Sequence, residues 1–224
     1  MRLSETFNSI QGEGPLQGRP AFFIRLAGCN LKCSFCDTPY AQTGVETDNI
    51  VSVVELRDQM LELTRLHGRD YPFVITGGEP LLQQEDIKLL LGNYFARSAK
   101  RANVWFETNG TIVPDKTLIV RYRPQFVVSP KVGHTNNNAL KALSELDAHF
   151  KFVVDDKEGW NFQIALELAF TFGIPKERIW MQPMAKDKKE LAKHGPKLWK
   201  QCSDFGVGYS PRLHTSLFGA KRGI

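Results

Sequence analysis

The chain has 224 residues, of which 42% are hydrophobic and 24% are charged, as is typical of a globular protein with one sizeable core. Its formal net charge is +5 and its pI is near 9.0, but it lacks the clustered Arg and interleaved aromatic residues that favour RNA binding. No apolar run approaches the roughly 20 residues of a membrane span. We therefore expect one domain over residues 1–224, with neither nucleic acid nor a membrane as partner.

Short strand-like runs alternate with helical periods along the chain. Strands are predicted where β-branched and aromatic residues gather, at residues 21–26, 73–76, 104–107, 126–129, 150–154 and 179–182. Helices are predicted from apolar residues at helical spacing, at residues 51–66, 87–95, 139–146 and 161–172. A weaker helix over residues 186–202 is expected to break at Gly195-Pro196, and the stretch from there to residue 224 has no clear periodicity.

This alternation predicts an α/β fold in which parallel strands are joined by right-handed crossovers. A closed TIM barrel of eight units needs about 250 residues, which is more than this chain offers. The predicted fold class is therefore a partial, about six-stranded TIM-like parallel barrel. The chemistry of such folds lies at the carboxyl ends of the strands. Five predicted strands end in polar motifs, namely the cysteine loop, Gly77-Gly78-Glu79-Pro80, Glu107-Thr108-Asn109-Gly110, Ser129-Pro130-Lys131 and Gln182-Pro183-Met184.

The cysteine loop after the first predicted strand is the most informative motif. Cys29, Cys33 and Cys36 have the spacing C-x3-C-x2-C, which cannot complete a four-cysteine zinc site. Three thiolates can hold three irons of a 4Fe–4S cluster and leave the fourth iron open for a substrate or co-substrate. A zinc knuckle that borrows His67 or His134 is the alternative, although the paired Cys/His spacing of zinc sites is missing.

The cysteines also indicate a compartment. Three clustered thiols do not make a disulfide framework, and they need a reducing environment to stay available for metal. The first residues show no apolar core of a secretory signal. We therefore expect a cytoplasmic protein, and we do not expect the distant Cys202 to be a cluster ligand.

The cysteine spacing, with Phe35 directly before the last cysteine, resembles that of the radical S-adenosylmethionine (SAM) enzymes. The resemblance implies a 4Fe–4S cluster on the three cysteines and SAM as cofactor. Backbone carbonyls and the carboxylate of the Gly-Gly-Glu-Pro motif would face the methionine ammonium of SAM. Lys131 would contact the SAM carboxylate. Without the resemblance, these residues would be interpreted as ordinary turn or loop residues. The SAM contacts that the resemblance implies are Phe35, Asp37, Gly78, Glu79, Ser129, Pro130, Lys131 and Gln182.

Residues 7–15 and 18–30, together with Asp37-Thr38 and Leu213-His214, closely resemble the 7-carboxy-7-deazaguanine synthase family. This resemblance implies that 6-carboxy-5,6,7,8-tetrahydropterin contracts to 7-carboxy-7-deazaguanine with loss of ammonia, on the route to 7-deazapurine (queuosine-type) tRNA bases. It also implies Mg²⁺, a homodimer and an electron donor such as flavodoxin or ferredoxin.

The same resemblance implies which residues bind this substrate. Mg²⁺ prefers oxygen ligands, so the Thr38 hydroxyl is its expected protein ligand. A pterin presents an amide-and-amine edge that Gln11, Gly12 and Glu13 would read, and Arg25 would meet the substrate carboxylate. The complete set of expected substrate-binding residues is Gln11, Gly12, Glu13, Arg25, Thr76 and His214. Without the motif match, Gln11–Gly14 would be interpreted as a surface turn and Arg25 as part of a salt bridge at the rim.

The C-terminal tail departs from the family pattern. The family tends to end soon after the residue matched by His214, whereas this chain continues to Ile224. We expect the tail to fold back over the barrel mouth with His214 at the substrate, and residues 221–224 to be dispensable. No role is assigned to His67, His134, His149 or His194.

Two other functions remain open at this point. One is an activase that generates a glycyl radical on a partner protein, although such enzymes often carry further cysteines or a longer C-terminal part. The other is a zinc-dependent RNA-binding module, suggested by the cysteines and the basic balance.

Overall fold

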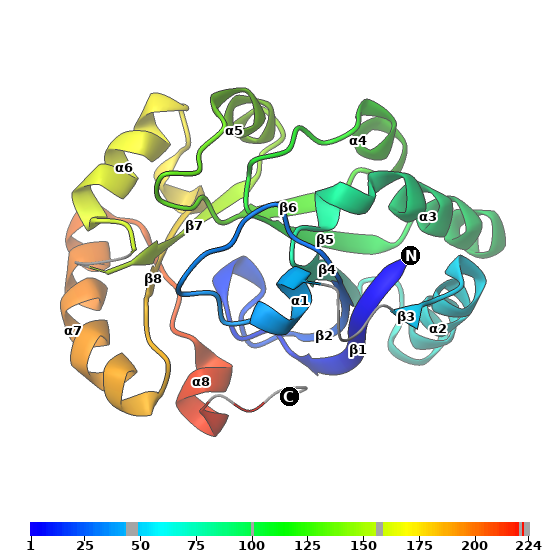
Figure 1. Ribbon diagram of the computed structural model, residues 1–224, viewed down its shortest axis with the longest axis horizontal. Coiled ribbons are helices and arrows are strands. Elements are labelled where there is room, and N and C mark those ends of the chain that lie inside the picture. The colour runs from blue at the N-terminus through cyan, green and yellow to red at the C-terminus, as the bar shows by residue number, and fades with distance from the viewer. Residues whose placement is uncertain (44–48, 100, 156–158, 220, 222–224) are drawn as a thin grey trace. The chain divides into compact units, whose positions relative to one another are not determined.

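The computed structural model (Figure 1) describes residues 1–43, 49–99, 101–155, 159–219 and 221. Its contacts divide the chain into two compact units, each made of three chain segments. The first unit holds Met1–Asn8, Pro20–Thr108 and Ile112–Gln125, and the second holds Ser9–Arg19, Asn109–Thr111 and Phe126–Ile224. The expectation of one domain stays a prediction. Among the described residues, no helix combines the length and the apolarity that crossing a bilayer requires.

The first unit is built on five strands in the spatial order β3-β1-β2-β4-β5. β1 and β3 pair antiparallel, whereas β2 pairs with β4, and β4 with β5, in parallel. In this register Ile24 lies opposite Ile75, which lies opposite Phe106, and all three side chains are fully buried. The strands are β1 (Arg2–Ile10, with its last two residues in the second unit), β2 (Pro20–Leu26), β3 (Asn49–Ile50), β4 (Pro72–Gly77) and β5 (Asn103–Thr108).

Helices connect the parallel strands of this unit. α2 and α3 lie side by side (Figure 1), and α2 begins where the Ser52 side chain accepts a hydrogen bond from the Val54 amide. α4 begins in the same way at Asp115. The helices are α1 (Pro39–Thr43), α2 (Val53–His67), the 3₁₀ turn η2 (Pro80–Gln83), α3 (Gln84–Ser98) and α4 (Lys116–Tyr122).

The second unit continues the α/β pattern with four strands in the order β6-β7-β8-β9, all paired in parallel. α6 packs on β7, and α7 packs on β8 and β9 (Figure 1). The strands are β6 (Gln125–Val128, with its first residue in the first unit), β7 (His149–Val154), β8 (Ile179–Pro183) and β9 (Gly208–Tyr209). The helices are η1 (Gly14–Leu16), α5 (Asn137–Ser144), α6 (Phe162–Thr171), η3 (Lys176–Arg178), α7 (Lys188–Phe205) and α8 (Leu213–Phe218).

All six predicted strands are present as β2, β4, β5, β6, β7 and β8, and β6 ends at Val128 rather than at residue 129. The prediction of about six strands was too low, because β1, β3 and β9 were missed. β3 and β9 have two residues each, which is too short to show a period. β1 has nine residues, but most of its side chains are half-buried or exposed, so it lacks a clear alternation.

The predicted break at Gly195-Pro196 was wrong, because α7 runs unbroken from Lys188 to Phe205. Leu198 and Cys202 bury one face of this helix, and that burial outweighs a cost of about 3 kcal/mol for an internal proline. The glycine at position 195 is explained by a local contact, since a Cβ there would lie 2.8 Å from the Tyr209 hydroxyl.

The tail after α7 is structured, which its lack of periodicity did not indicate. The Ser210 amide donates to the Met181 carbonyl, and the Leu213 amide donates to the Gly12 carbonyl, so backbone hydrogen bonds hold β9 and α8 in place. Of the segment predicted to be dispensable, residues 222–224 lie outside the described residues.

Candidate active site

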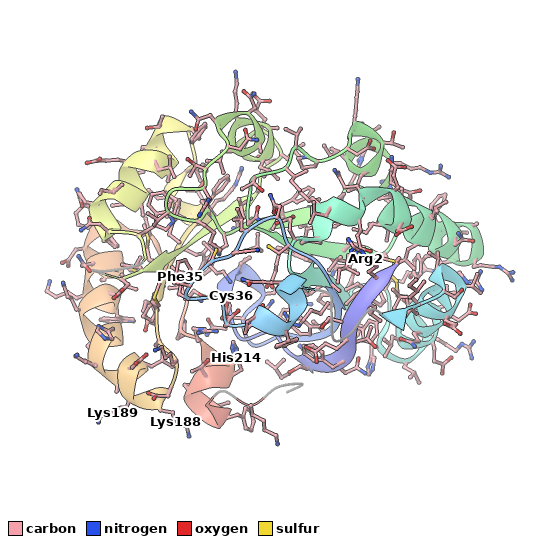
Figure 2. All side chains as sticks on the ribbon, viewed as in Figure 1. Arg2, Phe35, Cys36, Lys188, Lys189 and His214 are labelled. Carbon is pink, nitrogen blue, oxygen red and sulfur yellow. The ribbon has the colours of Figure 1, made fainter. Side chains whose placement is uncertain are left out.

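The cysteine loop joins β2 to α1 in the first unit, and Figure 2 shows Phe35 and Cys36 in it. Backbone hydrogen bonds anchor its start, from the Gly28 amide to the Ala41 carbonyl and from the Cys29 amide to the Gln42 carbonyl. The Cys36 amide donates to the Cys33 carbonyl in a turn. All three thiols are half-buried, so each remains within reach of a group held in the loop.

The three thiols lie close enough to influence one another. Burial raises the pKa of Cys29, as do the charges of Glu79, Cys33 and Cys36, while the Leu31 amide that donates to its sulfur at 3.4 Å lowers it. Cys202 differs, because it is buried in α7 and burial raises the pKa of its thiol to about 12. A thiol of this kind is a poor metal ligand.

The Gly77-Gly78 motif begins at the last residue of β4 and lies directly against the cysteine loop. A Cβ on Gly77 would lie 2.1 Å from the Leu26 carbonyl oxygen, and one on Gly78 would lie 2.2 Å from the Gly28 carbonyl oxygen. Gly77 also has φ +139°, a conformation that favours glycine. The Gly78 and Glu79 amides donate to the Leu26 and Gly28 carbonyls. The two glycines are therefore required by a main-chain contact between this motif and the cysteine loop.

Glu79 is fully buried at the end of this motif. Its carboxylate accepts hydrogen bonds from the Leu81 amide at 3.0 Å and from the Thr108 hydroxyl at 2.8 Å. The bond from the Leu81 amide caps the start of η2. The contact with the methionine ammonium that was assigned to Gly78 and Glu79 stays a prediction.

Arg25, on β2, is held by residues of β1 and α1. Its Nε donates to the Glu5 carboxylate at 2.8 Å, and the same oxygen accepts a bond from the Tyr40 hydroxyl at 2.9 Å. The guanidinium carbon lies 5.7 Å from the centre of the Phe7 ring. The salt bridge considered for Arg25 is thus present, and it orients the side chain rather than leaving it at a solvated rim, since only 16% of the side chain is exposed.

Of the other predicted residues of the first unit, Thr76 lies near the end of β4, and Asp37 and Thr38 lie in the cysteine loop. The Thr76 hydroxyl donates to the Glu107 carboxylate at 3.0 Å. Thr38 directly precedes α1, and its hydroxyl lies 3.4 Å from the Asp37 carboxylate and 3.8 Å from the Cys36 sulfur.

In the second unit, the structure brings the N-terminal motif together with the tail. The Gln11 side chain accepts a bond from the Glu13 amide, and the Leu213 amide donates to the Gly12 carbonyl. Gly12 has no room for a side chain, because a Cβ there would lie 2.3 Å from Nδ1 of His214. His214, shown in the first turn of α8 in Figure 2, thus lies beside Gly12, and its Nε2 is 3.8 Å from the Glu13 carboxylate.

The Glu13 carboxylate is bound by two cations. Lys151 binds one of its oxygens and the Nε of Arg212 binds the other at 3.0 Å. Burial alone would raise the pKa of Glu13, but the charges of Lys151, Arg212 and His214 hold it well below its ordinary value. Sequence reasoning missed Lys151 and Arg212. The available signal was a lysine inside the apolar run of β7, because lysines are rarely buried unless they are paired, and Lys151 is 7% exposed.

Of the predicted SAM-binding residues of this unit, Ser129, Pro130 and Lys131 follow β6, and Gln182 lies near the end of β8. Lys131 donates to the Ser129 hydroxyl at 2.8 Å, and the Trp160 indole donates to the Pro130 carbonyl at 2.8 Å. The Gln182 side chain accepts a bond from the Ser210 hydroxyl, which itself accepts one from the Gly14 amide. Gln182 is therefore tied to the N-terminal motif through Ser210.

Residues 23–151 match the family model of the radical SAM superfamily. The chain is 34% identical to a protein of Hyperthermus butylicus named 7-carboxy-7-deazaguanine synthase, over 96% of this chain and 91% of that protein. A protein of Pyrobaculum aerophilum with the same name is also 34% identical, over 100% of this chain and 97% of that protein. The chain belongs to the 7-carboxy-7-deazaguanine synthase family of radical SAM enzymes. Membership of this family excludes a zinc-dependent RNA-binding module. It also assigns the chain to 7-carboxy-7-deazaguanine synthases rather than to glycyl-radical activases.

Solved structures support the fold class. The crystal structure of QueE from Escherichia coli has a TM-score of 0.67 and 23% identity, and the match covers 95% of this chain and 94% of that one. Streptococcus suis SuiB bound to S-adenosylmethionine has a TM-score of 0.54 and 16% identity, covering 84% of this chain and 47% of that one. These likenesses confirm a mostly parallel α/β sheet that does not close, as in a partial TIM-like barrel.

Members of the radical SAM superfamily hold a 4Fe–4S cluster and SAM. The cysteine loop fits such a cluster, because it presents three half-buried thiols and an amide that donates to sulfur. Among the described residues, no three His, Cys, Asp or Glu side chains are arranged to hold a single metal ion.

Proposed function

We propose that this protein converts 6-carboxy-5,6,7,8-tetrahydropterin to 7-carboxy-7-deazaguanine and ammonia, in the synthesis of 7-deazapurine bases of the queuosine type. The conversion is balanced without an external oxidant, because the substrate differs from the two products only by rearrangement of its ring atoms and departure of one nitrogen as ammonia. The near full-length similarity to proteins of this name supports the proposal.

The observation that carries the proposal is the meeting of Gly12, Glu13 and His214 in the second unit. These residues come from opposite ends of the chain, and their contact uses a glycine that admits no side chain. The family resemblance of the sequence motifs assigns the same three residues to the substrate. A mostly buried carboxylate beside an imidazole suits the amine-and-amide edge of a pterin, because the carboxylate accepts the N–H donors of that edge.

The chain's own residues bind and orient the reactants. When bound, the reduced 4Fe–4S cluster and SAM supply a carbon-centred radical that removes a hydrogen atom from the substrate. Arg25, oriented by Glu5, would bind the substrate carboxylate, and Thr76 would contact the ring. Phe35, Asp37, Gly78 and Glu79, with Ser129, Pro130, Lys131 and Gln182, would hold SAM. The Thr38 hydroxyl would be the protein ligand of Mg²⁺, which keeps water or substrate oxygens as its other ligands.

The proposal is tested by an anaerobic turnover assay with reconstituted protein, dithionite, SAM, Mg²⁺ and the carboxylated pterin. We expect a deazaguanine chromophore and one ammonia per product molecule, with SAM present at the end of the reaction because it is a regenerated cofactor. The matched control is the Cys33→Ala protein, which should give neither product. If the parent protein cleaves SAM but yields no deazaguanine, the proposed substrate is wrong.

The proposed assembly is a cytoplasmic homodimer that receives electrons from a small carrier such as flavodoxin or ferredoxin. These features come from the family resemblance. Sedimentation of the reconstituted protein tests the dimer, and replacing dithionite by a reduced carrier in the same assay tests the electron donor.

A further inference from the structure

Glu13 is held by cations from two distant parts of the chain. Lys151 comes from the middle of β7, 138 residues away, and Arg212 directly precedes α8, 199 residues away. Lys151 binds Oε2 and Arg212 binds Oε1, so each carboxylate oxygen has its own cation. The side chains of all three residues are between 9% and 13% exposed, which leaves little water to compete with these bonds.

This arrangement fixes both the orientation and the charge of the carboxylate. Two cations on separate oxygens determine the plane of the carboxylate, and they favour its ionised form. An ionised carboxylate accepts hydrogen bonds and donates none. It offers about four lone-pair positions, of which Lys151 and Arg212 use one on each oxygen, so it can still accept N–H donors from a ligand.

We infer that Lys151 and Arg212 are positioning residues that hold Glu13 as an oriented acceptor, so that this position selects the N–H donor edge of the substrate. The inference rests on the proposed function, and it adds two residues and the chemical basis of selectivity to it. Neither residue belongs to a motif that the sequence singled out, since Lys151 lies inside a strand and Arg212 inside the tail.

Arg212 also ties the C-terminal helix to this carboxylate. It is the residue before α8, and its second bond runs from Nη1 to the Ala185 carbonyl at 2.7 Å. The next residue, Leu213, donates its amide to Gly12, and His214 then lies beside Glu13. Arg212 therefore positions both the carboxylate and the start of the helix that carries His214.

The first test observes Glu13 itself and needs no turnover. Protein labelled with ¹³C at the Glu carboxyl carbons is titrated by NMR, and the Glu13 signal is assigned by its loss in Glu13→Gln. In the parent we expect no titration down to the lowest pH at which the fold persists. In Lys151→Met the pKa should rise by about 1–3 units, because one opposite charge is removed while burial remains. Lys151→Arg should restore the parent behaviour, and Lys193→Met, which removes an exposed lysine of α7, should not change it.

The second test observes selectivity. Affinity for the carboxylated pterin and for its analogue without the 2-amino group is measured by equilibrium binding across acidic pH. The parent should prefer the aminated ligand at every pH, whereas Lys151→Met should lose this preference as pH falls through the raised pKa of Glu13. Arg212→Met should lose the preference for the aminated ligand as well. It should also weaken binding of both ligands, because Arg212 positions the helix that carries His214. Adding His214→Ala to Arg212→Met should therefore reduce the affinity little further.

The outcomes separate the inference from the proposed function. A parent protein that does not bind the pterin contradicts the proposed function, while the NMR titration still decides whether Lys151 and Arg212 hold the carboxylate ionised. If Glu13 titrates normally in the parent, or if Lys151→Met leaves its pKa unchanged, the inference is wrong. If Lys151→Met does not fold, the double variant Lys151→Met/Glu13→Gln should fold, because the carboxylate that lost its lysine is replaced by a neutral amide and Arg212 keeps its bond to the Ala185 carbonyl; its failure to do so would show that Lys151 is structural rather than a partner of Glu13.

Discussion

At Gly12 one methyl group is enough to disturb the candidate site. A Cβ there would lie 2.3 Å from Nδ1 of His214 and 3.1 Å from its backbone nitrogen, so the imidazole would have to turn away and the backbone of His214 would have to shift slightly. We expect Gly12→Ala to raise KM for the pterin several-fold. In the His214→Ala background the same change should cost less, because the imidazole that it meets is gone. Additive effects of the two substitutions, measured as KM in a double-mutant cycle, would contradict this geometry.

The cysteines divide into two classes that iron analysis can distinguish. Cys29, Cys33 and Cys36 are half-buried in one loop, whereas Cys202 is buried in α7 and has a pKa raised to about 12. Cys202→Ala should therefore keep about four irons per chain after reconstitution, and each of the other three Ala variants should lose the cluster. Loss of iron in Cys202→Ala together with retention in any of the others would refute the assignment.

Among single residues, the sequence predicted Glu13 and His214 but not the groups that hold them. The reason is physical, because Lys151 and Arg212 act through contacts across 138 and 199 residues, and a lone lysine in an apolar strand forms no motif. The Glu13 ion pairs also link stability to pH. With the pKa of Glu13 lowered from its ordinary value of 4.5, their stabilisation is fully present above that value and is lost as pH falls below it.

At the scale of elements, α1 and β1 together orient Arg25 on β2. Glu5 accepts bonds from both Arg25 and Tyr40, so the helix that follows the cysteine loop is linked to the arginine expected to read the substrate carboxylate. Arg25→Ala should lose about 2–5 kcal/mol of preference for the carboxylated pterin over its decarboxylated analogue. Glu5→Gln should lose part of this preference and Tyr40→Phe less still. Equal preference in the parent and in Arg25→Ala, measured by competition binding, would show that another cation reads the carboxylate.

Two neighbouring positions in α7 should respond differently to substitution by alanine. Pro196→Ala restores a backbone donor inside the helix and should raise the free energy of unfolding, by at most about 3 kcal/mol. Gly195→Ala would gain about 1 kcal/mol from helix propensity, but its Cβ meets the Tyr209 hydroxyl at 2.8 Å, so we expect no net gain. Urea unfolding of both variants tests this pair, and a larger gain at position 195 would contradict it.

The elements that could be predicted are those whose own residues bury a regular face. Phe73, Val74 and Ile75 make β4 recognisable because a buried parallel strand is apolar on both faces. β9 and α8 could not be predicted, because β9 has two residues and α8 has six, which is too few to show a period. Both elements are held instead by backbone hydrogen bonds to the Met181 and Gly12 carbonyls. The unbroken α7 shows the opposite error, in which tertiary burial of Leu198 and Cys202 overrides a local breaker.

At the scale of the whole molecule, the two units are interleaved in sequence. Each consists of three segments, so the chain passes from one to the other five times, and neither unit is a continuous stretch that could be expressed alone. We therefore expect a single cooperative unfolding transition for the cluster-free protein under anaerobic, reducing conditions. In calorimetry the measured enthalpy should equal the van't Hoff enthalpy. Two resolved transitions would contradict the expectation of one domain.

The long separation between Glu13 and its cations has a consequence during protein synthesis. During translation Arg212 is added 199 residues after Glu13. At the usual 5–20 residues per second the interval is about 10–40 s. A nascent chain that has not yet reached Arg212 therefore carries Glu13 without this cation, and the carboxylate can be oriented by both cations only once Arg212 has been added.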